Sequence, residues 1–133
     1  MLGKLLLTLD AIGLLLGAPI ADYNHTHIFN PRWPPHAKFH GAQTITLSVL
    51  LGLLTLYYTW RRTTTRTAAR DSARTAALTG SVYWVAGIAA ILFPGTDGVD
   101  PEFGPSGFPQ LPVFATFLGL AVVGGVWEWS GVR

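Results

Sequence analysis

The chain contains, at positions 44–58, the stretch Thr44-Ile-Thr-Leu-Ser-Val-Leu-Leu-Gly-Leu-Leu-Thr-Leu-Tyr-Tyr58, which has no charged residue. Such a stretch approaches the roughly 20 apolar residues that a helix needs to cross a ~30 Å hydrocarbon core. Pro34-Pro35 upstream suits the first turn of a helix, because proline is tolerated there. We therefore expect a helix over about 35–60, and three more apolar segments predict helices over about 5–20, 76–93 and 112–129.

The composition indicates a membrane protein with one domain. Of the 133 residues, 50% are hydrophobic and only 12% are charged, whereas a soluble domain carries about 25% charged residues. Cysteine is absent. Disulfides and thiolate metal sites are therefore excluded, and any metal would need nitrogen and oxygen ligands.

The basic residues indicate an orientation in the membrane. The predicted loop 61–74 carries five arginines: Arg61, Arg62, Arg66, Arg70 and Arg74. The Gly- and Pro-rich acidic loop 94–111 has no Lys or Arg, and the His-rich loop 22–40 has only Arg32 and Lys38. By the positive-inside rule the arginine-rich loop is cytoplasmic. The sequence thus predicts an all-α, four-helix transmembrane bundle over 1–133, with both termini cytoplasmic.

Under this topology the His-rich loop and the loop 94–111 share the extracytoplasmic face. The arginines are explained as a topology signal and a contact for anionic lipid headgroups. The expected partner is therefore the lipid bilayer, and nucleic acid is not expected.

All four histidines lie in the loop 22–40, and their spacing suggests a metal site. His36 and His40 are four apart on a predicted helix and so share a face. His25 and His27 are two apart, and in an extended stretch they would point the same way. Together with Asp22 they make a nitrogen and oxygen ligand set suited to zinc, copper or iron. Further carboxylates come from the opposite loop: Asp97, Asp100 and Glu102.

The run Asp-Tyr-Asn-His-Thr-His at 22–27, followed by Phe-Asn-Pro-Arg-Trp-Pro-Pro-His-Ala-Lys-Phe-His at 29–40, resembles an uncharacterised family of small four-helix integral membrane proteins from fungi and bacteria. Beyond this region the likeness is one of hydropathy. Some members carry an acetyltransferase label, but this chain has no Gly-rich loop opening a helix that would hold the pyrophosphate of coenzyme A. The resemblance places His25 at a variable position and implies as site residues Asp22, Asn24, His27, Asn30, Trp33, His36 and His40.

Asp10 interrupts the first apolar segment. An ionised carboxylate in the membrane centre costs at least ~2.5 kcal/mol, so such residues face the bundle interior and are often functional. We therefore include Asp10 with His36 and His40 as candidate catalytic residues.

Three functions are compatible with these features, and whether the protein is an enzyme stays open. The first is a metal-dependent enzyme acting on a lipophilic small molecule, with the metal held chiefly by His27, His36 and His40. The second is a metal-free membrane isomerase or cyclase that uses His and Asp as acid and base. The third is a non-enzymatic accessory or transport subunit, whose His-rich loop docks a partner or senses pH. A protein partner or a homo-oligomer is compatible with these functions.

Overall fold

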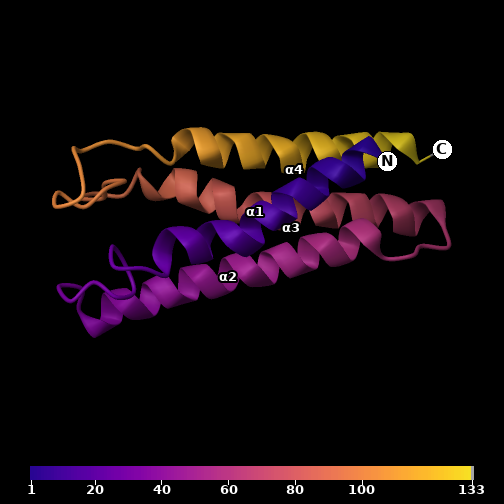
Figure 1. Cartoon of the computed structure of the whole chain (residues 1–133). Coiled ribbons are helices and arrows are strands. Elements are labelled where there is room, and N and C mark those ends of the chain that lie inside the picture. Colours follow the sequence, from indigo (N-terminus) through magenta and orange to yellow (C-terminus); the bar gives the residue numbers. More distant parts are fainter. Residues whose placement is uncertain (133) are drawn as a thin grey trace.

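The computed structural model describes residues 1–132, which form four α-helices and no strands (Figure 1). The helices are α1 (Leu2–Asp22), α2 (Pro35–Trp60), α3 (Arg66–Ala90) and α4 (Leu111–Gly131). They alternate in direction, so both termini and the link 61–65 lie together at one end, here called the terminal end (Figure 1). The segments 23–34 and 91–110 lie at the opposite end, here called the loop end. The predicted all-α four-helix bundle is confirmed.

Three of the helices are long and apolar enough to cross a membrane. These are α1, α2 and α4. The 21 residues of α1 would extend roughly 32 Å at 1.5 Å per residue, which matches a hydrocarbon core of about 30 Å. Among the described helices α3 does not meet this standard, because its first half carries Arg66, Arg70, Asp71 and Arg74. The protein is therefore a membrane protein by composition, and α3 packs mainly against α4 and α2.

The helix α3 begins at Arg66, well before the expected start near position 76. The Thr65 side chain caps it by accepting a hydrogen bond from the Ala68 N–H at 3.2 Å, as Ser and Thr do at helix N-termini. Ala73 and Ala76 on one face are buried while the arginines are exposed. The first part of α3 is therefore an amphipathic helix that the average hydropathy of the segment did not reveal. The link between α2 and α3 covers only 61–65, not the predicted 61–74.

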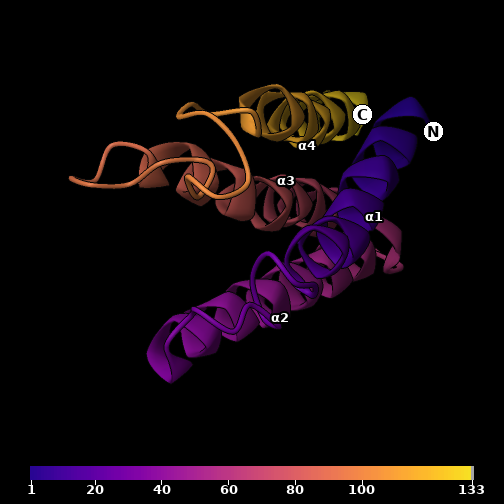
Figure 2. The ribbon, with the colours of Figure 1, turned by 60° about the vertical axis from the view of Figure 1, so that its left-hand side comes forward.

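The helix α1 lies obliquely across the bundle, so it contacts different helices at its two ends. Figure 2 shows its N-terminal end beside α4 and its C-terminal end beside α2. Near its start, a Cβ on Gly3 would lie 2.6 Å from the carbonyl oxygen of Gly124 on α4. Further along, the Ser48 hydroxyl of α2 donates to the Leu14 carbonyl at 2.6 Å. Because α1 leaves α4 as it approaches the loop end, space opens between α1–α2 and α3–α4 there.

Candidate functional site: a cavity at the loop end

A cavity of about 1170 Å³ occupies the loop-end half of the bundle. This exceeds the ~300–1,000 Å³ typical of small-molecule sites. All four helices and the loop 91–110 contribute to its wall. On α1 the lining runs from Leu9 to Asp22, a distance of roughly 20 Å along the helix. The cavity therefore has the length of an extended lipophilic molecule.

Exposed apolar side chains form part of the wall of this cavity. Leu16, Ile20 and Leu47 line it, and they are 52%, 73% and 47% exposed on the protein surface. The cavity wall is therefore partly made of side chains that also belong to the apolar outer surface of the helices.

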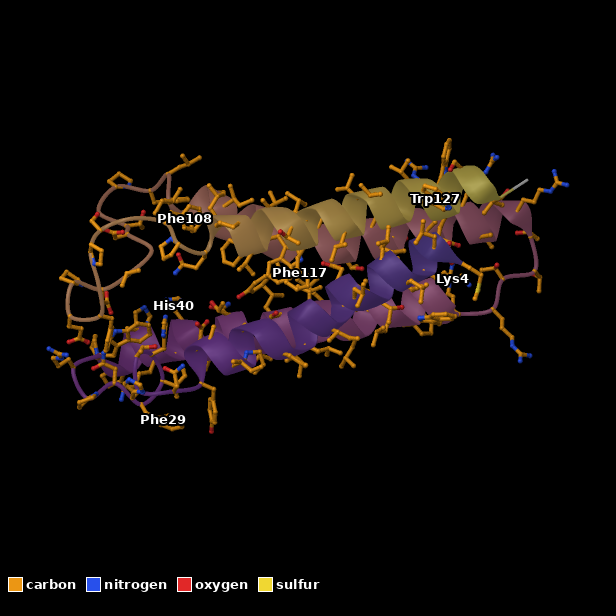
Figure 3. All side chains as sticks on the ribbon, turned by 45° about the horizontal axis from the view of Figure 1, so that its top comes forward. Lys4, Phe29, His40, Phe108, Phe117 and Trp127 are labelled. Atoms are coloured by element: carbon orange, nitrogen blue, oxygen red, sulfur yellow. The ribbon has the colours of Figure 1, made fainter. Side chains whose placement is uncertain are left out.

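Aromatic side chains from α3, α4 and the loop before α4 form one wall of the cavity. The Trp84 ring stacks on Phe117, with centroids 4.9 Å apart and planes at 19°, and it also lies 5.7 Å from Phe114. Figure 3 shows Phe117 between α4 and α1 and Phe108 near the loop end. The complete aromatic wall is Tyr83, Trp84, Phe108, Phe114 and Phe117.

The indole of Trp84 is held by the buried Asp10. Its Nε1–H donates to Asp10 Oδ1 at 2.7 Å, and both side chains are almost completely buried. The other carboxyl oxygen, Oδ2, has no hydrogen-bond partner among the described residues and lies against Gly80, where a Cβ would be only 2.3 Å away. Asp10 does not itself line the cavity. Its contact orients Trp84 rather than a ligand.

Asn24 organises the polar end of the cavity. Its side-chain Nδ2 donates to the carbonyls of Ile20 and Ala21, which ends α1. This leaves Oδ1 to accept from the Thr26 N–H at 2.8 Å and the Thr26 hydroxyl at 2.7 Å. Asn24 therefore fixes the turn that brings His27 back to the end of α1, where both His27 and Asp22 line the cavity.

This network decides which nitrogen of His27 carries a proton. Asn24 Oδ1 has no hydrogen, so the Thr26 hydroxyl must donate to it. The same hydroxyl lies 2.7 Å from His27 Nδ1, and it can then only accept from that nitrogen. Nδ1 is therefore protonated, and Nε2 is the atom that gains and loses a proton. It lies 3.7 Å from Asp22 Oδ1, and the Trp33 ring contacts the imidazole edge-on with centroids 4.9 Å apart.

The two loops at the loop end are held together by polar contacts. Glu102 accepts a hydrogen bond from the buried Asn30 amide at 2.9 Å and forms an ion pair with Arg32. Asp100 accepts from the Trp33 indole N–H at 3.2 Å. The prediction that these loops share one end is confirmed, although the acidic residues meet Asn30, Arg32 and Trp33 and not the histidines.

Asp97 stabilises a turn within the loop 91–110. Its carboxylate accepts from the Ser106 hydroxyl and from the backbone N–H groups of Gly107 at 2.9 Å and Gly98 at 2.7 Å. These hydrogen bonds, that of Ser106 above all, hold the pKa of the Asp97 carboxyl below its usual value. The hydrogen bonds of the Asp97 carboxylate are thus made within its own loop, so this carboxylate stabilises the loop.

The structure does not gather the predicted metal ligands. His36 and His40 are exposed at the start of α2, with their Nε2 atoms 3.1 Å apart and His40 Nδ1 near the Gln43 amide oxygen at 3.2 Å. His27 pairs with Asp22 instead, and the exposed His25 contacts the Phe103 ring. Across residues 1–132, no three side chains of His, Asp or Glu come close enough to hold a metal ion. As the structure places them, these donors therefore do not fit a zinc, copper or iron centre.

The proposed catalytic set of Asp10, His36 and His40 is likewise separated. Asp10 is buried near the middle of α1, whereas the histidine pair is exposed at the start of α2, at the loop end. The sequence did signal His27, Asp22 and Asn24, through their place in the family-like run. It gave no signal for the aromatic wall, because its members come from α3, α4 and the loop before α4 and meet only in three dimensions.

The fold and composition define a helical membrane protein with an internal cavity at the loop end. Residues 6–132 match the model of a family of unknown function, DUF6640, and the chain belongs to that family. Searches of curated proteins and of solved structures each found no match.

Proposed function

We propose that this protein binds a lipophilic small molecule in the loop-end cavity and moves protons on it, as an isomerase or cyclase does. The observation that carries the proposal is the cavity itself: its volume is about 1170 Å³, most of its lining residues are apolar, and His27 and Asp22 lie at its polar end. A site for a membrane-dissolved substrate needs an apolar body and a few polar groups that fix orientation.

His27 and Asp22 supply the acid–base chemistry in this proposal. His27 Nε2 takes a proton from a carbon of the ligand, and the nearby Asp22 carboxylate stabilises the imidazolium that forms. Return of the proton at another carbon completes an isomerisation. In a cyclisation the imidazolium form delivers its Nε2 proton to a double bond, the ring closes on the carbocation that forms, and Nε2 takes a proton back from the carbon next to the final cation. Neither reaction consumes an oxidant or a second substrate.

The loop end faces the extracytoplasmic side in this proposal. Lys4 and the arginines of the link and of early α3 lie at the terminal end, and the positive-inside rule places such an end in the cytoplasm. The chain has no cysteine, so single Thr96→Cys and Thr63→Cys variants each carry one thiol. Labelling of Thr96→Cys alone by a membrane-impermeant maleimide is expected, and labelling of Thr63→Cys alone would reverse the orientation.

Binding is tested by filling the cavity. Gly17 lines it, and a Cβ there would meet only the Trp84 ring, at 3.8 Å. Gly17→Leu therefore places a side chain in the cavity without a backbone clash. Gly119→Leu is the matched control, since nothing lies within 4 Å of a Cβ at that position and it does not line the cavity. Mass spectrometry of purified protein should find a lipophile retained by wild type and Gly119→Leu and depleted in Gly17→Leu.

Proton transfer is tested without knowing the substrate. Protein in nanodiscs is incubated in D₂O with a total lipid extract, and untargeted mass spectrometry looks for a compound that gains deuterium. His27→Gln should lose this labelling and still retain the lipophile. His25→Gln, a neighbouring exposed histidine outside the cavity, should keep it. Labelling that persists in His27→Gln, or no labelling with wild type, would contradict the chemistry.

A further inference from the structure

The charges that line the loop-end cavity are all of one sign. Asp22 and Asp97 contribute carboxylates, and no Lys or Arg side chain lines this cavity. Asp97 is already held by Ser106 and two backbone N–H groups. Asp22 differs: its carboxylate makes no hydrogen bond in the described part of the chain, and its nearest charged partner is His27 at 3.7 Å. The Asp22 carboxylate is therefore the group left for a ligand.

The hydrogen-bonding groups at the polar end of the cavity also favour a cationic ligand that donates hydrogen bonds. With Nδ1 engaged by Thr26, neutral His27 presents only an acceptor at Nε2 toward Asp22. An acceptor facing a carboxylate leaves both groups without a donor between them. A ligand that brings a donor satisfies this pair of acceptors, and one that also brings a positive charge attracts the Asp22 carboxylate as well, whereas a carbonyl oxygen, which only accepts, would be repelled.

The aromatic wall adds a second, independent preference. Ring faces carry negative potential and attract cations at about 6 Å or less from the centroid. Trp84 is only 2% exposed and stacks on Phe117, so the rings that can meet a cation are the partly exposed Tyr83, Phe108 and Phe114. Trp84 is kept in place by its 2.7 Å hydrogen bond to Asp10 and by stacking on Phe117. Because this side chain is already held in place, little conformational entropy is lost in ordering the wall when a ligand binds.

We infer that the loop-end cavity takes a lipophilic amine in its protonated form, with the ammonium between Asp22 and the aromatic wall and the apolar body along the apolar part of the cavity wall. This inference rests on the proposed function, because it names the chemical class of the ligand for the same cavity.

The test compares two probes that differ in charge alone. A radiolabelled arylalkyl amine and its carbon isostere, with CH in place of the ammonium nitrogen, are bound to wild-type protein in nanodiscs. The amine is expected to bind about tenfold more tightly, as a desolvated cation beside a carboxylate and an aromatic face should. Because this comparison uses wild type, it does not depend on any variant folding.

Two carboxylate variants sharpen the test. Asp22→Asn should remove most of the preference for the amine and leave binding of the isostere unchanged. Asp71→Asn, an exposed carboxylate at the terminal end outside the cavity, should leave both unchanged. Equal binding of amine and isostere to wild type, or a preference that survives Asp22→Asn, would overturn the inference.

The outcomes also separate this inference from the proposed function. If a lipophile is retained by wild type and lost in Gly17→Leu, but the amine shows no advantage or neither probe binds, only the cationic ligand is refuted. If no lipophile is retained and Gly17→Leu alters no binding, both fail.

Discussion

The terminal end and the loop end of this bundle are built from similar small residues but packed in opposite ways. At the terminal end, helix backbones touch: a Cβ on Gly125 would lie 2.3 Å from the Ala77 Cβ, and one on Gly124 would lie 2.9 Å from the Gly3 carbonyl. At the loop end, a Cβ on Gly17 would meet only one ring atom, at 3.8 Å. At this end Gly87 instead makes room for the Phe114 ring, which a Cβ would meet at 2.4 Å. Glycine thus lets helix backbones approach at one end and makes space for a cavity and its aromatic wall at the other, so a small residue in a membrane helix does not by itself indicate close helix packing.

The largest expected effect comes from breaking the closed end. Gly125→Leu forces α3 and α4 apart, because Ala77 has no flexible side chain that can move aside. Overpacking typically costs about 1–3 kcal/mol and occasionally more, and the approach of 2.3 Å to the Ala77 Cβ places this variant at the upper end. Unfolding in mixed micelles, followed by circular dichroism, should show this loss for Gly125→Leu.

The control for this comparison is Gly119 on the same helix. A Cβ there meets nothing within 4 Å, so Gly119→Leu should keep wild-type stability or gain slightly from helix propensity. Equal stability of the two variants would mean that the terminal end is not closely packed.

A smaller effect is expected where the two ends meet. Trp84→Phe keeps an aromatic ring but removes the N–H that bonds to Asp10 Oδ1, leaving a buried carboxyl with no partner. Such an orphaned group costs about 1–3 kcal/mol. The double variant Asp10→Leu/Trp84→Phe removes the unpaired carboxyl as well and should recover part of the lost stability. A double-variant cycle measures the coupling, and simple additivity of the two changes would show that the hydrogen bond has no net effect.

The smallest expected effect concerns pH and the loop end alone. The pKa of Asp97 is lowered in the folded protein from its ordinary value of 3.8, chiefly by the Ser106 hydroxyl. Its contribution to stability is therefore fully present above that ordinary value and is lost as the pH falls through the lower, folded pKa. From neutral pH down to about 4 the melting temperature of wild type minus that of Asp97→Asn should stay constant.

Below that range the difference in melting temperature should shrink as Asp97 takes up a proton. A difference that already changes near neutral pH would show that another group is responsible. Asp71→Asn, at the terminal end, serves as the control because it lacks these loop contacts.

The sequence predicted the architecture well and the site only in part. Apolar segment length and alternating charge are local properties, and they led to the four helices and to the shared end of the two loops. The start of α3 was missed because Ala73 and Ala76 face inward while Arg70 and Arg74 face outward, which average hydropathy cannot resolve.

The site itself depends on contacts that spacing cannot reveal. His36 and His40 do meet, as four residues on a helix should. His27 joins Asp22 instead, because Asn24 ends α1 and turns the chain back at Thr26. The aromatic wall combines residues from α3 and α4, and the sequence contains no local pattern that pairs Trp84 with Phe117 or with Asp10.

Leu16, Ile20 and Leu47 form an exposed apolar rim of the cavity, and under the proposed function this rim affects how the potency of a ligand is measured. A ligand that enters through this rim arrives from the acyl-chain region, so the bilayer acts as its reservoir. Its occupancy then follows its concentration in the membrane and not in water. Two ligands with the same intrinsic affinity will differ in apparent aqueous potency by the ratio of their partition coefficients, and rankings obtained in detergent and in bilayers will diverge accordingly.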